Sequence, residues 1–164
     1  MSPIFEFKTI KDLQSSTGIK IPKNDKNKIE EILKKMPVRL TDFLVSLCKK
    51  SPAIAKQFLP NIKELECTGE FCTWGGVIDT YIHGLERLYL DRCIIMPFMG
   101  CPAYCRFCFR KYYDKSPQMM SYGDIDKALG YIKKDKKLKS VLITGGDPLM
   151  ELKRLEYILK NLRK

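Results

Sequence analysis

Three cysteines within eight residues constrain this chain more than any other feature of its sequence. They lie in the segment Cys101-Pro102-Ala103-Tyr104-Cys105-Arg106-Phe107-Cys108, which has the spacing C-x3-C-x2-C and follows an apolar run at residues 94–99. Gly100 permits backbone conformations closed to other residues, and Pro102 lacks the N–H that a strand ladder needs. The sequence therefore predicts a short strand that ends in an irregular loop, residues 101–108, here called the cysteine loop.

Three thiols on so short a loop indicate metal chemistry. Thiolates are the ligands that zinc and iron–sulfur clusters favour. A structural zinc site normally has four protein ligands. Three thiolates on a four-iron cube instead leave one iron open, where a substrate or cofactor could bind. From the spacing alone, a cluster, a zinc ion and unligated thiols all stay open.

A second motif lies downstream, in the segment Val141-Leu142-Ile143-Thr144-Gly145-Gly146-Asp147-Pro148. Its first half predicts a short buried strand, and the strand ends in two glycines and an acid, residues 145–147, here called the Gly-Gly-Asp motif. Glycine lets the backbone approach a ligand closely, and a carboxylate accepts strong hydrogen bonds from an ammonium group. The pattern is typical of a site for a ligand that carries an amino group.

The cysteine loop resembles the cluster-binding motif of the radical S-adenosylmethionine (radical SAM) enzymes, in which an aromatic residue usually precedes the third cysteine, as Phe107 does here. The resemblance implies a [4Fe–4S] cluster held by Cys101, Cys105 and Cys108. It also implies that S-adenosylmethionine (SAM) is bound by Phe107, Thr144, Gly145, Gly146 and Asp147.

Other stretches resemble the N-terminal region of the lysine 2,3-aminomutase family within these enzymes. They are Pro37-x-Arg39-Leu40-Thr41-x-Phe43, Lys56-Gln57-Phe58-Leu59-Pro60, and His83-Gly84-Leu85 followed by Tyr89-x-Asp91-Arg92. The resemblance implies that Arg110 binds the substrate carboxylate and that Tyr89 and Arg92 contact the phosphate of pyridoxal phosphate (PLP). Leu88 stands where the family has an arginine for that phosphate. The lysine that holds PLP belongs to the family's C-terminal half and is absent from this chain.

Hydrophobic periodicity predicts a helical first half. Ile29, Ile32, Leu33 and Met36 form a helical stripe that Pro37 ends. Thr41 and the Ser51-Pro52 pair are start signals for two further helices, of which the first carries Phe43, Leu44 and Leu47. Residues 1–24 predict a lead-in with little core potential, because turn-forming clusters interrupt them.

The second half alternates strands and helices. Ser121 with Asp124 predicts a helix start, the strand over residues 141–144 follows, and Glu151 opens a last helix. That helix carries on one side Leu152, Leu155, Ile158, Leu159 and Leu162. We therefore expect an α/β chain, with a parallel sheet and its sites at the carboxyl ends of the strands. The expected domains are a helical extension at 1–85 and the first two βα units of a radical SAM (partial TIM-type) barrel at 86–164, truncated there.

The charge and the apolar content of the sequence limit the classes of partner that we expect for this chain. The net charge of +11 gathers partly at lysines 133–139, but no aromatic side chains alternate with them for stacking on bases, so we expect a solvated surface and no nucleic acid. No apolar stretch reaches the roughly 18 residues of a membrane span, and the start does not resemble a signal peptide, which predicts a cytoplasmic protein.

Four further cysteines, Cys48, Cys67, Cys72 and Cys93, are predicted to be structural thiols. For the pair Cys67 and Cys72, beside Trp74, a metal role stays open.

The resemblance implies that SAM is cleaved to methionine and a 5′-deoxyadenosyl radical with an electron from an external donor. That radical would start amino-group migration on an amino acid or a protein lysine. We expect this chain of 164 residues to need its missing C-terminal half, and to be inactive alone. Two alternatives stay open, a metal-stabilised RNA- or protein-binding module with a basic surface, and a non-functional remnant.

Overall fold

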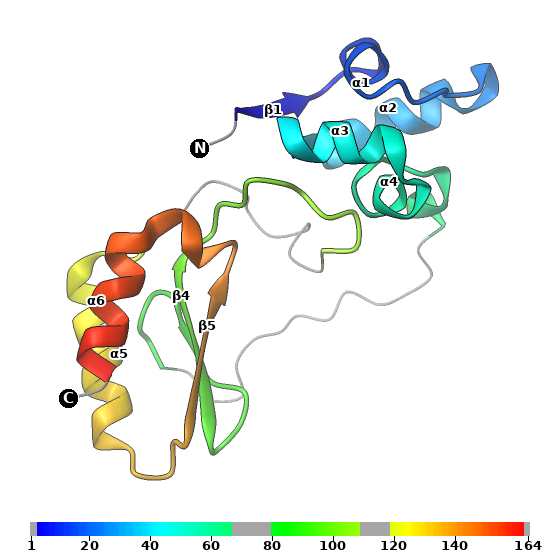
Figure 1. The fold of residues 1–164 in the computed structure, drawn as a ribbon. Helices are drawn as coiled ribbons and strands as arrows, with labels where there is room; N and C mark the ends of the chain where they lie inside the picture. Colours follow the sequence, from blue (N-terminus) through cyan, green and yellow to red (C-terminus); the bar gives the residue numbers. More distant parts are fainter. Residues whose placement is uncertain (1–2, 67–79, 109–118, 163–164) are drawn as a thin grey trace. The chain divides into compact units, whose positions relative to one another are not determined.

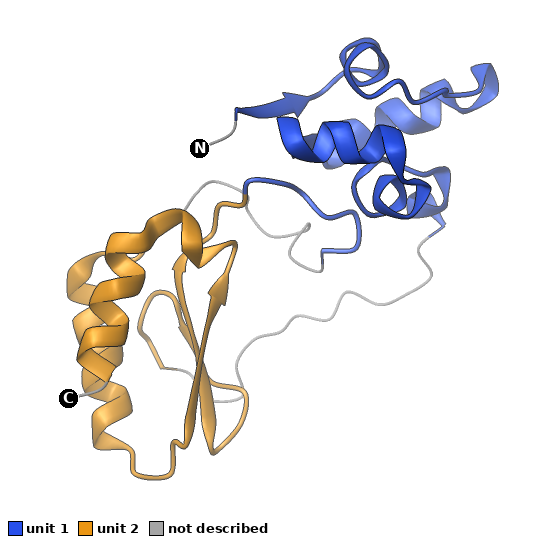
Figure 2. Ribbon diagram, viewed as in Figure 1, with its two compact units in different colours: residues 1–70, 102–113 blue, residues 71–101, 114–164 orange. Residues whose placement is uncertain are grey.

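The computed structural model describes residues 3–66, 80–108 and 119–162. The chain divides into two compact units (Figure 2). Unit 1 comprises Met1–Glu70 and Pro102–Tyr113, and unit 2 comprises Phe71–Cys101 and Asp114–Lys164. The division into domains at 1–85 and 86–164 stays a prediction.

Unit 1 is a small helical body with one strand pair (Figure 1). Its elements are β1 (Ile4–Phe7), α1 (Ile10–Thr17), η1 (Lys23–Asp25), α2 (Lys26–Lys35), β2 (Val38–Thr41), α3 (Asp42–Lys50), α4 (Pro52–Phe58) and η2 (Ile62–Leu65). The predicted helix starts are confirmed, since the Thr41 hydroxyl accepts from the Leu44 N–H and the Ser51 hydroxyl from the Ile54 N–H. The stripe of α2 is buried as predicted. Helix α3 instead buries Val45 and Cys48 and exposes Phe43.

The prediction of a lead-in with little core potential is wrong. Strand β1 pairs antiparallel with β2, with Phe7 opposite Val38, and Phe7, Ile10 and Leu13 are buried in the core of unit 1. The pattern is faint in the sequence because a strand of four residues and a helix of eight bury only a few side chains each. Gly18, at a φ of 73°, ends α1 in the left-handed conformation that glycine adopts without strain.

Unit 2 is a three-stranded sheet with two helices packed on it. Its strands are β3 (Leu85–Glu86), β4 (Arg92–Phe98) and β5 (Ser140–Gly145), in the order β3-β4-β5. Strand β3 runs antiparallel to β4, and β4 runs parallel to β5, with Cys93 opposite Val141 and Ile95 opposite Ile143. The helices are α5 (Tyr122–Lys134) and α6 (Leu152–Leu162), preceded by the short η4 (Pro148–Glu151). The chain is thus of mixed α/β class, and its parallel strand pair agrees with the prediction.

The capping signal of α5 is confirmed, because the Ser121 hydroxyl accepts from the Asp124 N–H at 3.0 Å. One other expectation is wrong in part. Strand β5 is not buried on both faces, since Leu142 is 57% exposed. In α6, Ile158 is fully buried, but Leu152 and Leu159 are exposed. Figure 1 shows α5 and α6 together on one side of the strands, so only side chains that face this side enter the core.

The described helices include none long and apolar enough to cross a lipid bilayer.

Candidate metal centre

Cys105 and Cys108 lie on one turn of the cysteine loop, in unit 1. The Cys108 N–H donates to the Cys105 carbonyl oxygen at 3.0 Å. Both are free thiols of intermediate burial. Burial raises the pKa of the Cys105 thiol above its ordinary value, and the neighbouring Cys108 raises it further. Two free, partly accessible sulfur atoms on one turn are a donor set that suits a soft metal or an iron–sulfur cluster.

Cys101 is the third thiol and belongs to unit 2. It is also partly buried and follows Gly100, just after the carboxyl end of β4. Within the residues that the structure describes, no group of three or more His, Cys, Asp and Glu side chains is gathered around a common point. Ligation by all three cysteines therefore stays a prediction.

The cysteine loop is anchored to strand β2 and helix α4 of unit 1 through its own main chain. The Tyr104 N–H donates to the Arg39 carbonyl at 2.9 Å, and the Arg106 N–H donates to the Gln57 carbonyl at 2.7 Å. The Arg39 guanidinium also lies over the Tyr104 ring, 5.5 Å from its centroid. These contacts fix the chain on both sides of Cys105.

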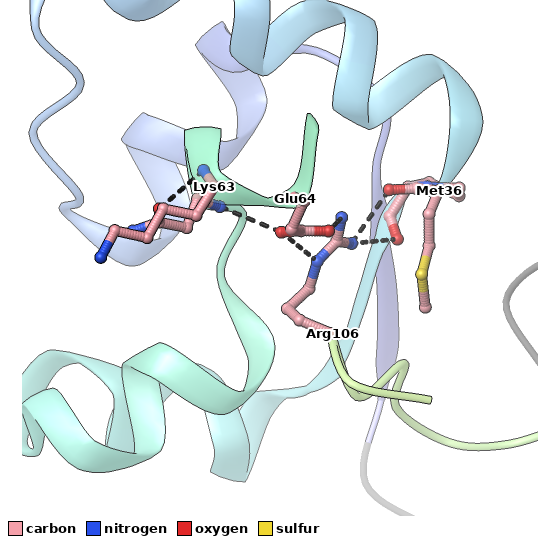
Figure 3. Close-up of polar contacts among 6 residues, drawn as sticks. Met36, Lys63, Glu64 and Arg106 are labelled. Atoms are coloured by element: carbon pink, nitrogen blue, oxygen red, sulfur yellow. Dashed lines mark hydrogen bonds and ion pairs between the residues drawn. The ribbon is translucent and has the colours of Figure 1, made fainter. Parts of the chain in front are cut away.

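Arg106 and Phe107, neighbours between two of the predicted ligands, lie in opposite environments. Only 5% of Arg106 is exposed, and its guanidinium forms an ion pair with Glu64 (Figure 3). Phe107 is 69% exposed. The sequence does not predict this ion pair, because its partners lie 42 residues apart and neither has a pattern that identifies the other.

The Gly-Gly-Asp motif follows β5 in unit 2 and packs against the backbone that follows β4. The Gly146 N–H donates to the Phe98 carbonyl at 2.9 Å, and the Asp147 N–H donates to the Gly100 carbonyl at 2.8 Å. A Cβ atom on Gly146 would lie 2.3 Å from the Gly100 oxygen, and Gly145 has a φ of 118°. Both positions therefore require glycine.

Asp147 has a local partner as well. Its side chain accepts a hydrogen bond from the Leu149 N–H at 3.0 Å and so caps η4. Thr144, the preceding polar residue of β5, is partly buried. The glycine motif and the residue before Cys101 thus meet at the carboxyl ends of two neighbouring parallel strands, where ligand sites in such sheets lie.

The residues predicted to contact PLP lie elsewhere in unit 2. Arg92 begins β4, so Tyr89 and Arg92 are at the opposite end of this strand from Gly100. The Arg92 guanidinium lies 5.1 Å from the Tyr89 ring centroid and pairs with Asp91 at 3.1 Å. Their roles stay predictions. Arg110, Cys67 and Cys72 lie outside the described residues.

The comparison with known proteins gives the family. The profile of the Radical SAM superfamily matches residues 95–164, which include the cysteine loop and the Gly-Gly-Asp motif. A protein of Aquifex aeolicus (strain VF5), provisionally named L-lysine 2,3-aminomutase, is 32% identical over 146 residues, or 87% of this chain. The chain belongs to the radical SAM superfamily.

Further relatives of this radical SAM chain share the same name. The L-lysine 2,3-aminomutase of Methanococcus maripaludis is 30% identical over 87% of the chain, and that of Clostridium subterminale is 28% identical over 89%. The chain spans less than half the length of these relatives, namely 39% of the Aquifex protein, 35% of the Methanococcus protein and 37% of the Clostridium protein. The radical SAM chain is therefore related to lysine 2,3-aminomutases over a part of their length.

Proposed function

We propose that this chain is the cluster- and SAM-binding part of a radical SAM enzyme of the lysine 2,3-aminomutase type. The observation that carries the proposal is the hydrogen bond between Asp147 and Gly100, which joins the Gly-Gly-Asp motif to the residue directly before Cys101. In this proposal Cys101, Cys105 and Cys108 hold a [4Fe–4S] cluster. Once bound and reduced by an external donor, the cluster supplies the electron that cleaves SAM to methionine and a 5′-deoxyadenosyl radical.

The residues of the chain bind and orient SAM. The backbone of Gly145 and Gly146 allows the methionyl group to approach closely, because no side chain intervenes. The Asp147 carboxylate accepts hydrogen bonds from the methionyl ammonium group. Phe107 is exposed on the cysteine loop, and in this proposal it covers the bound SAM. Thr144 adds a hydroxyl group to the polar residues that bind SAM.

The finer architecture and the substrate belong to the same proposal. The segments β4–α5 and β5–α6 form the first two βα units of a partial barrel, which the rest of the protein would complete. The relatives named above are aminomutases for L-lysine, so we propose an amino acid or a protein lysine as the substrate. Arg110 would bind its carboxylate. Tyr89 and Arg92 would contact PLP where this cofactor is used.

The test is anaerobic purification and reconstitution of the chain with iron and sulfide. We expect about four irons per chain, as a cubane requires, with broad visible absorption. Cys105→Ala should lose both the bound iron and the visible absorption. The matched control is Cys48→Ala, a free thiol that is buried in the helical core of unit 1 and should leave iron binding unchanged. One colourless zinc per chain would favour the metal-stabilised binding module, and the absence of any bound metal in the wild type would refute the proposal.

Cleavage of SAM is the second readout. Dithionite-reduced wild-type protein should produce 5′-deoxyadenosine and methionine from SAM, and Cys105→Ala should not. Because the chain spans less than half of its relatives, the reaction is measured both with the chain alone and with the whole protein. Cleavage by Cys105→Ala at the wild-type rate would refute the ligand assignment.

A further inference from the structure

Arg106 is a buried cation inside the cysteine loop. Its Nε donates to Glu64 Oε1 at 3.1 Å and its Nη2 donates to Glu64 Oε2 at 2.7 Å, so the pairing is bidentate. Its Nη1 donates to the carbonyls of Met36 at 3.0 Å and Pro37 at 3.4 Å (Figure 3). These bonds join the cysteine loop to the C-terminal end of α2 and to η2.

Glu64 is itself held in place. Its Oε1 also accepts from the Asn61 N–H at 3.0 Å, and the Asn61 side chain accepts from the Lys63 N–H, which makes a capping box around η2. Only 16% of the Glu64 side chain is exposed. The acceptor that receives Arg106 is therefore preorganised by its own helix and does not depend on the cysteine loop.

The chemistry of the contact requires arginine. A guanidinium has five N–H donors in a planar fork, and here they reach one carboxylate and two carbonyls in different directions. A lysine at this position would keep the charge but could not form the bidentate pair and reach both carbonyls together. Arg106 directly follows Cys105 and is two residues before Cys108. Holding its backbone in place therefore also restricts the backbone positions of both cysteines.

We propose that the Arg106–Glu64 pair is a positioning device for the predicted cluster ligands, and that the helical unit 1 is the scaffold on which Cys105 and Cys108 are held ready before iron arrives. This inference rests on the proposed function. Arg106 touches neither iron nor SAM in this proposal and acts only through the two thiols. The region expected from sequence to be an extension thus has a defined task in the site.

The test uses Glu64→Gln and Arg106→Lys in the full chain, with Asp135→Asn as the matched control. Asp135 pairs with Arg87 in unit 2, where the Arg87 side chain is 4% exposed, compared with 5% for Arg106. The control therefore breaks a similarly buried ion pair in unit 2, the unit that does not contain Cys105 and Cys108. Alkylation rates of Cys105 and Cys108 are measured by mass spectrometry in iron-free protein, and the rate of iron loss to a chelator is measured in reconstituted protein.

In Glu64→Gln and Arg106→Lys we expect both cysteines to alkylate about ten- to a hundredfold faster, because a loop that loses a charged hydrogen bond opens more often. Iron loss should accelerate in the same two variants. Asp135→Asn should alter neither the alkylation rate nor the rate of iron loss, even if its melting temperature falls as much as those of Glu64→Gln and Arg106→Lys. Equal rates in the wild type and the two variants would overturn the proposal, as would equal acceleration in Asp135→Asn.

The outcomes separate this inference from the proposed function. If the wild type binds no cluster, the proposed function fails, while the alkylation rates of iron-free protein still report whether the pair holds the thiols. Circular dichroism checks that each variant is folded. If both variants lose the helices of unit 1, the pair serves the fold as a whole and the positioning role is refuted.

Discussion

The main-chain N–H of Asp147 donates to the carbonyl oxygen of Gly100 at 2.8 Å. The bond connects two residues of unit 2 that lie more than 40 positions apart in the sequence, because it joins the ends of two adjacent parallel strands. It can form only if the residue between the strand and Asp147 has no side chain. Gly146 meets this condition, since an added Cβ would lie 2.3 Å from the Gly100 oxygen and 2.5 Å from the Met99 oxygen.

Gly146→Ala should therefore destabilise unit 2. Both atoms met by the new Cβ belong to the backbone, so we expect a cost of about 1–3 kcal/mol, as for other overpacked sites. The control is Gly130→Ala in α5, where no atom lies within 4 Å and the helix should gain about 0.5–1 kcal/mol. Urea unfolding measures both. A Gly146→Ala variant as stable as the wild type would contradict the geometry.

Asp147 has a structural and a proposed binding role, and two substitutions separate them. Asparagine caps a helix as well as aspartate does, so Asp147→Asn should keep the bond from the Leu149 N–H and the stability of η4. Asp147→Ala should cost about 1 kcal/mol. Both should weaken SAM binding about tenfold or more, because a charged acceptor is lost. Calorimetric titration of the reconstituted protein measures this. If Asp147→Asn binds SAM like the wild type, the carboxylate acts only as a cap.

The Arg87–Asp135 pair predicts a pH dependence of stability. Arg87 lies 2.5 Å from the Asp135 carboxylate, and its hydrogen bond lowers the pKa of Asp135 below the ordinary 3.8. A carboxylate whose pKa is lowered in the folded state contributes its full stabilisation of the fold at pH values above its ordinary pKa. This stabilisation is lost as the pH falls through the pKa of the folded state. Asp135→Asn should thus be less stable than the wild type at neutral pH, and the difference should shrink below about pH 4.

The measurement is urea unfolding of both proteins at several pH values. A difference in unfolding free energy that is the same at neutral and acid pH would show that the charge of Asp135 plays no part. Lys127→Ala serves as a control, because its pair with Asp124 is exposed on the lysine side and should contribute little.

Two neighbouring residues of α6 test the direction in which this helix faces. Ile158 is fully buried in the core of unit 2, so Ile158→Ala should cost about 2–5 kcal/mol. Leu159 is 44% exposed, and Leu159→Ala should change the free energy of unfolding by about 0.5 kcal/mol or less. Thermal or urea unfolding compares the two variants. Equal costs would mean that both side chains share the core, as the apolar stripe alone suggests.

The features that the sequence predicts well are those whose physical cause is local. Thr41, Ser51 and Ser121 each cap a helix through a residue three positions ahead, so the signal and its effect lie in one short window. The stripe of α2 is likewise contained in ten residues. The carboxyl-end position of the two motifs follows from the alternation of strands and helices.

The features that the sequence does not predict depend on distant partners. Strand β1 is stabilised by β2, more than 30 residues away, and Arg106 by Glu64, which precedes it by 42 residues. The exposure of Leu142 and Leu159 is missed for another reason. An apolar pattern shows that a face can be buried, but which elements cover that face is a property of the packed chain.

The contrast between Arg106 and Phe107 has a consequence for mutational tolerance. In a library of all single substitutions scored for iron retained after reconstitution, position 106 should accept few residues, because no other side chain can form the bidentate pair with Glu64 and also reach the Met36 carbonyl. Position 107 should accept most residues, since its ring lies largely in solvent. Selection for catalysis in the whole enzyme would then show whether the reaction itself requires an aromatic residue at position 107.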